Sequence, residues 1–187
     1  MSAPPAKNVS NTSHPSLFFL ISSLTAYAHS PWGQYQVYRQ KHLLILSTIV
    51  DEPTYPYSKK LVEAINQVIP EANTRPARAK NFERVHSLIK TKQLQLVLLS
   101  KDNAIALLEG SGPFSNFGAV DVRTLYAFGD MLLLVQPDFS DSHVWLLADA
   151  FKKLYRSLPD AFPPEKILTL PNLHPAALLA IRGDPQP

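Results

Sequence analysis

The sequence contains no cysteine, which excludes disulfide bonds, thiolate nucleophiles and cysteine-ligated metal sites. It also has little net charge, because 18 Lys and Arg residues stand against 15 Asp and Glu residues. A cluster of basic residues occurs at Arg75, Arg78, Lys80 and Arg84, but no aromatic residues accompany it to stack on bases. We therefore expect a solvated edge there and no nucleic-acid partner.

The motifs of the common catalytic sites are also missing. The six histidines show neither the HExxH pattern nor another metal-ligand spacing, no G-x-S-x-G elbow occurs, and no Walker or G-x-G-x-x-G loop follows a predicted strand. His86 and His143 fall within amphipathic helical patterns, and His174 precedes a helical pattern that it is expected to cap. We predict no enzymatic activity, no cofactor and no metal site.

Two unbroken apolar runs organise the rest of the chain. Residues 42–48 and 94–99 lack the alternating polar residues of a strand with one solvent-exposed face. This pattern is typical of strands covered on both sides in a parallel sheet. Further strands are expected at 73–78, where Pro76 favours a sheet edge, at 122–128 and at 131–136, the last two joined by a tight turn at Gly129 and Asp130. With 187 residues, one α/β domain with a five-stranded, mostly parallel sheet is predicted.

Helical spacing of apolar residues predicts helices between and after these strands, on both faces of the sheet. They are expected at 57–69, at 82–89, at 104–109 after an Asp102 or Asn103 cap, from Asp141 or Ser142 to about 155, and at 174–182. Gly110 is expected to end the third of these helices. The domain then spans 42–182, with a linker at 29–41 and a tail at 183–187.

The N-terminal part carries a possible export signal. The apolar run 17–24 precedes Ala26-Tyr27-Ala28, which has the small-x-small form of a signal peptidase site. A retained membrane anchor that extends to Trp32 is the alternative, and a buried or amphipathic segment is a third possibility. Residues 1–28 are thus predicted to be a signal peptide or an anchor.

Several motifs resemble those of one family of transport proteins. They are Thr54-Tyr55-Pro56 before a helix, the 94–102 strand and loop, Gly110-Ser111-Gly112-Pro113-Phe114, Val122-Arg123-Thr124-Leu125 and Leu173-His174-Pro175-Ala176-Ala177. Together, over roughly 43–182, the chain resembles the TAXI-type solute-binding proteins of TRAP transporters, which have the type 2 periplasmic-binding fold. Since about five residues separate Gln136 from the Asp141 helix, the resemblance implies a single lobe of that two-lobed fold.

The strand order 2-1-3 that this resemblance implies places the carboxyl ends of the first and third strands side by side. Ligands of open α/β sheets bind at such ends, so the predicted binding residues are Thr48, Thr54, Tyr55, Ser100, Lys101 and Asn103. Hydroxyl groups, helix N-terminal amides and Lys101 would bind a carboxylate, whereas Asp51, Glu52 and Asp102 would oppose an anion unless they cap helices or bind an ammonium group. This mixture of charges favours an amino acid over a dicarboxylate.

The resulting hypothesis is a non-catalytic envelope protein that binds a small organic solute, an amino acid or a carboxylate, and works with a membrane transporter. Its expected location is the periplasm or the outer face of the inner membrane. The alternative is a binding lobe that has lost its solute and acts as a structural or assembly partner in an envelope complex.

Overall fold

The computed structural model describes residues 1–2 and 38–187. Arg39–Pro187 forms one compact unit. Apart from Met1 and Ser2, the predicted signal peptide or anchor at 1–28 and most of the predicted linker lie outside the described residues. Among residues 1–2 and 38–187, no helix combines the length and the apolar character needed to cross a membrane.

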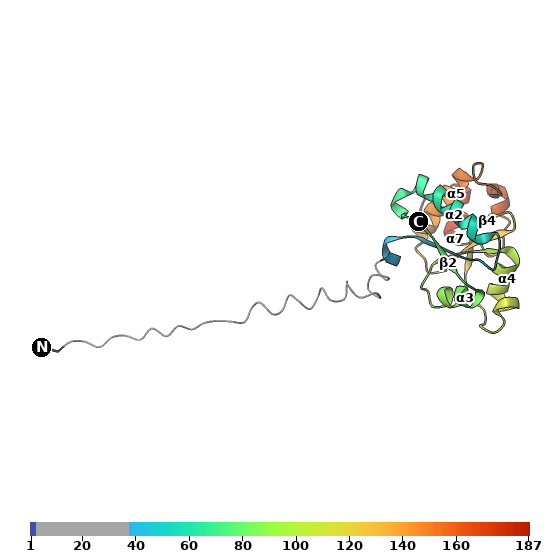
Figure 1. Ribbon diagram of the computed structural model, residues 1–187. Coiled ribbons are helices and arrows are strands. Elements are labelled where there is room, and N and C mark those ends of the chain that lie inside the picture. Colours follow the sequence, from blue (N-terminus) through green and yellow to red (C-terminus); the bar gives the residue numbers. More distant parts are fainter. Residues whose placement is uncertain (3–37) are drawn as a thin grey trace. The chain divides into compact units, whose positions relative to one another are not determined.

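A five-stranded sheet with the order β2-β1-β3-β5-β4 forms the centre of the compact unit (Figure 1). Its strands are β1 (Leu44–Thr48), β2 (Arg75–Ala79), β3 (Leu96–Ser100), β4 (Arg123–Phe128) and β5 (Met131–Val135). The pairs β1–β2 and β1–β3 are parallel, whereas β3–β5 and β4–β5 are antiparallel. The α/β class and the mostly parallel five-stranded sheet are confirmed. The antiparallel strand is β5, because the Gly129 turn folds it back between β3 and β4.

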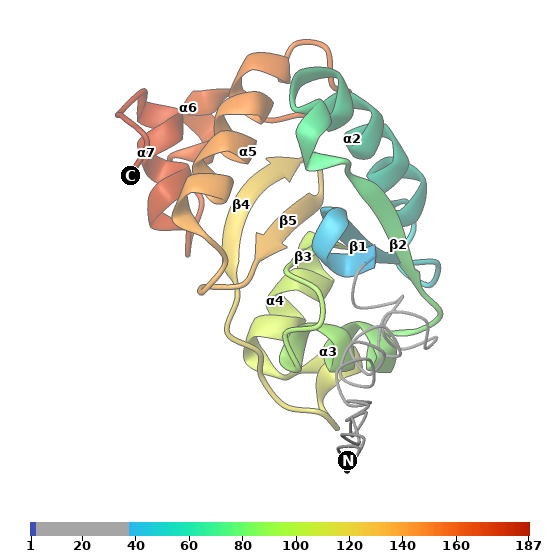
Figure 2. The same ribbon diagram turned by 90° about the vertical axis from the view of Figure 1, so that its left-hand side faces the viewer.

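Helices cover both faces of the sheet (Figure 2). One face carries α2 (Thr54–Val68) and α5 (Asp141–Leu154), and the other carries α3 (Phe82–Lys90) and α4 (Lys101–Glu109). The short α6 (Pro164–Ile167) and α7 (Pro175–Arg182) follow α5, and α7 packs against it. Two 3-10 turns, η2 (Pro70–Ala72) and η3 (Gly112–Phe114), complete the described elements.

The central strands are buried on both faces, as their unbroken apolar sequences predict. Every residue of β1 and β5 is buried, and in β3 Leu96, Leu98 and Leu99 are fully inaccessible to solvent. An aromatic cluster extends this core between the sheet and α5, with the Tyr126, Phe128 and Phe151 ring centroids 5.3 Å apart. Burial of both faces is the reason why these central strands lack the apolar–polar alternation of a strand with one solvent-exposed face.

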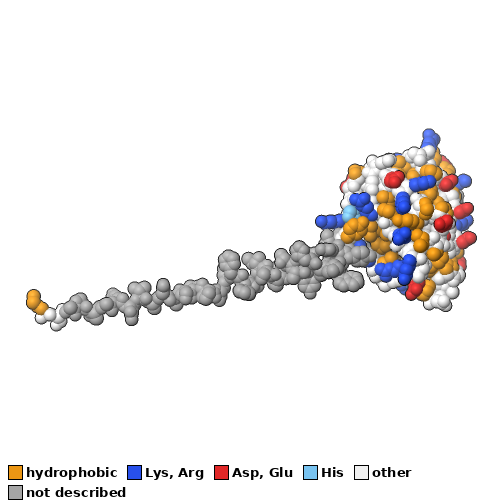
Figure 3. Space-filling view, viewed as in Figure 1, with side chains coloured by type: hydrophobic (Ala, Val, Ile, Leu, Met, Phe, Trp, Pro, Cys, Tyr) orange, Lys and Arg blue, Asp and Glu red, His pale blue; other side chains and the backbone are white. Residues whose placement is uncertain are grey.

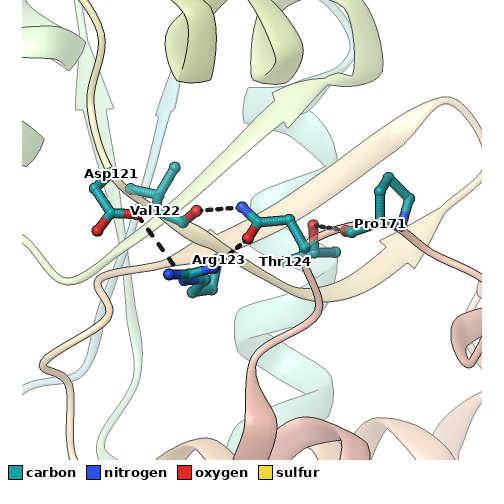
Figure 4. A network of polar contacts seen from close by, with 6 residues as sticks. Asp121, Val122, Arg123, Thr124 and Pro171 are labelled. Carbon is teal, nitrogen blue, oxygen red and sulfur yellow. Dashed lines mark hydrogen bonds and ion pairs between the residues drawn. The ribbon is translucent and has the colours of Figure 1, made fainter.

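The two edge strands are protected differently. In β2, exposed Arg75 and Arg78 and the missing N–H of Pro76 discourage another strand from pairing with it. Beside β4, the loop before α7 runs parallel to the strand: Asn172 donates to the Val122 carbonyl at 2.7 Å and accepts from Arg123 at 2.6 Å (Figure 4). The backbone N–H of His174 also donates to the Thr124 carbonyl at 2.8 Å, so this loop covers the β4 edge.

Some helix starts differ from the sequence-based expectation. Helix α4 begins at Lys101 with Ser100 as its N-cap, three residues before the predicted start, and α5 has Ser140 as its N-cap instead of Asp141 or Ser142. Two capping predictions are confirmed. Gly110 ends α4 in a left-handed conformation, and the Nδ1 atom of His174 accepts the Ala176 N–H at the start of α7.

Candidate functional site

The six predicted binding residues lie at the carboxyl ends of two neighbouring parallel strands. Thr48 ends β1, and Thr54 and Tyr55 begin α2 after a short loop. Ser100 ends β3, and Lys101 and Asn103 belong to the first turn of α4. Because β1 pairs directly with β3, both loops leave the sheet at the same edge, as the 2-1-3 order predicts.

Asp51 joins the two loops through its carboxylate. One oxygen accepts the Ser100 backbone N–H at 2.8 Å, and the other accepts the Asn103 side-chain amide, also at 2.8 Å. Asn103 additionally donates to the Ser100 hydroxyl at 3.0 Å. Asp51 is only 5% exposed, so a carboxylate of the chain itself occupies the position in which the sequence placed a ligand's carboxylate.

Thr48 and Thr54 serve the fold of the first loop. Both are fully buried, and the Thr54 hydroxyl donates to the Asp51 carbonyl at 2.6 Å and reaches the Thr48 carbonyl at 3.3 Å. The Thr48 hydroxyl accepts the Val50 N–H at 3.5 Å. In this conformation neither hydroxyl is accessible to a solute, because each is turned toward the backbone of its own loop.

Tyr55 is partly exposed at this edge, and we call the group of Tyr55, Lys59 and Arg78 the rim. The ring is half-buried, and two cations approach it: Lys59 Nζ lies 4.8 Å and the Arg78 guanidinium carbon 5.6 Å from the ring centroid. Arg78 comes from β2, opposite Ser47 of β1. Both cations are exposed, and none of the ion pairs within 38–187 includes either of them.

Electrostatics at this rim favour an anion. The first turn of α2 contains no acidic residue, which leaves its amide groups favourable to an anion, although exposed Glu52 precedes the helix by two residues. Exposed Lys101 lies at the neighbouring strand end, and the nearby Asp51 charge is already hydrogen-bonded inside the protein. Figure 3 shows Lys and Arg side chains gathered over the middle of the face that carries β2.

Tyr57, in the first turn of α2, serves the fold. Burial, with a contribution from Asp160, raises the pKa of Tyr57 far above its usual value, and its hydroxyl donates to the Pro159 carbonyl. A phenol with such a raised pKa stays protonated and acts as a structural donor. Within the described part of the chain, no three His, Asp or Glu side chains are grouped so that they could hold a metal ion.

Sequence reasoning missed Lys59 and Arg78. Lys59 follows Tyr55 by four residues, and this helical spacing predicts that the two share a face. Arg78 was recognised only as part of a basic cluster, since its position beside Tyr55 depends on the pairing of β2 with β1. The Gly112-Pro113-Phe114 motif instead serves packing, because buried Phe114 contacts the Phe82 ring with centroids 5.4 Å apart.

No protein-family model matches the chain, and the comparison with curated proteins also finds no match. The residues at the strand ends are therefore the basis for inferring a function.

Proposed function

We propose that the protein is a non-catalytic solute-binding protein that holds a small organic carboxylate at the rim formed by Tyr55, Lys59 and Arg78. The observation that supports this most strongly is the pair of exposed cations beside one aromatic ring, neither of which forms an ion pair with a carboxylate of residues 38–187. A carboxylate bound here would pair with Arg78 in the two-pronged geometry that a guanidinium favours. Lys59 would add charge, and the Tyr55 ring would pack against the solute's carbon skeleton.

The proposed site lies outside the crevice between β1 and β3. Asp51 already accepts the Ser100 and Asn103 donors there, so a solute gains nothing by competing for them. Lys101 remains a candidate contact because it is exposed at the same edge. A carboxylate without an ammonium group suits this rim better than an amino acid, because the two charged groups beside the Tyr55 ring are cations.

We also propose that the chain is related to the family whose motifs it resembles. The order β2-β1-β3 is the one that a lobe of the type 2 periplasmic-binding fold would have, and the site lies at the strand ends used in open α/β sheets. On this proposal the chain is a single-lobed relative of the TAXI-type solute-binding proteins. It would work in the periplasm, or anchored to the outer face of the inner membrane, beside a transporter.

The test is a calorimetric titration of the full chain with a panel of monocarboxylates, dicarboxylates and amino acids. Arg78→Gln should weaken the binding of the best carboxylate about tenfold or more, which corresponds to about 1.4 kcal/mol, and Lys59→Gln should weaken it less. Lys60→Gln is the matched control, since Lys60 is the exposed neighbour of Lys59 and makes no contact with Tyr55 in the structure. Binding that is unaffected by Arg78→Gln would contradict the proposed site.

An assembly role is the second candidate, and a specific observation favours it. Ile49 and Val50, in the loop between β1 and α2, are 46% and 53% exposed, so two consecutive aliphatic side chains face solvent beside a strand end. A protein partner would cover them, whereas a small solute at Tyr55 would not need them. A panel without any binding solute, together with an envelope protein whose co-purification is lost on Ile49→Ser/Val50→Ser, would support this role over solute binding.

A further inference from the structure

A cavity lies at the opposite end of the parallel strands from the Tyr55 rim. Its volume is about 300 Å³, and its walls come from the segment before β1, the end of α2 with η2, and the start of α5. A smaller cavity of about 90 Å³ shares Leu43 and Phe139 with it and continues toward Gln93 and Gln95 before β3. The two hollows together favour an elongated occupant over a compact one.

The walls of the larger cavity are divided by chemistry. Leu43, Ile69, Leu146 and Leu147 supply an aliphatic surface, and Phe139 adds an aromatic ring. Leu146 is 38% exposed, so part of this apolar surface is open to solvent. A volume of about 300 Å³ with mostly apolar walls lies at the small end of the range for ligand sites.

Polar groups of predominantly basic character stand among these apolar walls. Lys41 and His143 are exposed, and the His143 imidazole stacks on the Phe139 ring with centroids 5.6 Å apart. Arg39 also contributes to the lining, with one guanidinium N–H bound to Gln93. Glu71 is the acidic residue among the lining side chains, so an anionic head group is favoured only where it lies closer to Lys41 and His143 than to Glu71.

We propose that this cavity binds an amphiphilic monocarboxylate, with its alkyl chain against Leu43, Ile69 and Leu146 and its carboxylate toward Lys41 and His143. The site is separate from the rim at Tyr55, since it lies at the amino ends of β1 and β3. It would bind the class of medium-chain fatty acids or similar alkyl carboxylates. The apolar walls provide the affinity, because each methylene group that leaves water contributes favourably, and the basic residues orient the head group.

The experiment is a titration of the isotope-labelled full chain with sodium octanoate, followed by amide chemical shifts. Saturable shifts are expected at Ala72, His143 and Leu146, with a Kd of about 1 mM or tighter. Acetate, which has the head group alone, and octylammonium, which has the chain with the opposite charge, should each bind at least about tenfold more weakly.

Variants separate the two parts of the site. Leu146→Asp should weaken octanoate about tenfold or more, whereas Leu168→Asp should leave it unchanged, because Leu168 is a similarly exposed leucine, 42% against 38%, that does not line the cavity. Glu71→Gln should tighten binding by removing the opposing charge, a gain that damage to the fold would not produce.

Three results would overturn the proposal. They are an absence of saturable shifts, shifts that map to Tyr55 and Arg78 instead of the cavity, and octylammonium binding as tight as that of octanoate. None of these variants changes a residue of the Tyr55 rim. A negative result for the cavity would therefore not count against carboxylate binding at the rim, which the Arg78 and Lys59 variants test separately.

Discussion

Replacing Asp51 tests whether the chain's own carboxylate holds the two strand-end loops together. In Asp51→Ala the Ser100 N–H and the Asn103 amide each lose an acceptor at 2.8 Å. A hydrogen bond to a charged group contributes about 1.5–3 kcal/mol, and because Ser100 and Asn103 are half-buried, water replaces part of the loss. We expect the free energy of unfolding to fall by about 2–4 kcal/mol.

Such a loss is a large fraction of the stability of a typical domain, which is about 5–15 kcal/mol. For a unit of this size it corresponds to a decrease in Tm of about 4–16 °C. Asp51→Asn should fall between the wild type and Asp51→Ala, because an amide oxygen can accept one of the two hydrogen bonds while the amide nitrogen faces the other donor.

Urea unfolding followed by circular dichroism measures these changes. Asp102→Ala is the control. Asp102 is an exposed carboxylate in the first turn of α4, next to Asn103, and its loss should lower the free energy of unfolding by less than about 1 kcal/mol. A double-mutant cycle of Asp51→Ala with Asn103→Ala should give a coupling energy of about 1 kcal/mol. If Asp51→Ala costs no more than Asp102→Ala, or if the cycle shows no coupling, the bridge between the loops does not contribute as argued.

Three further predictions concern the fold. Leu98→Asp should abolish the cooperative unfolding transition, because Leu98 is fully buried in the central β3 and its replacement buries an unpaired charge; a near-native melting curve would contradict the double-sided burial of β3. Burial lowers the pKa of His174, which caps α7 through a neutral Nδ1 atom, so the unfolded chain binds this proton more readily. The contribution of His174 to the free energy of unfolding should therefore be fully present above about pH 6.5 and decrease as the pH falls below it. Urea titrations at several pH values should find this pH dependence reduced in His174→Gln. Asn172→Ala should lower the free energy of unfolding by about 1–3 kcal/mol by removing the side-chain bonds to Val122 and Arg123, and an unchanged urea midpoint would show that the loop does not stabilise the β4 edge.

The order of the elements could be predicted from the sequence because each strand and helix has its own local pattern. The apolar runs that end near Thr48 and Ser100 predicted buried strands, and Pro76 predicted that β2 lies at an edge of the sheet; the structure confirms both. The place of β5 in the sheet was not predictable in the same way. The tight Gly129 turn predicts that β5 runs antiparallel to β4, but no local pattern shows that β5 also pairs with β3.

The candidate site shows a similar division. Parallel pairing of β1 and β3 was enough to bring Tyr55 and Lys101 to one edge of the sheet, and the structure places them there. The role of Asp51 was not predictable, since a carboxylate after a strand can face solvent, cap a helix or repel a ligand. Its two hydrogen bonds join it to Ser100 and Asn103, which lie 49 and 52 residues later in the sequence, so they depend on how the two loops meet in the fold.

The bonds of Asp51 explain why the strand ends need no ligand to satisfy their donors. Its carboxylate accepts the Ser100 backbone N–H and the Asn103 side-chain amide from within the same domain. The cations that remain exposed, Lys59 and Arg78, lie further out, beside an aromatic ring. If a solute binds at the proposed rim, we expect charge and ring contacts to hold it, and we expect its affinity to fall as salt is added.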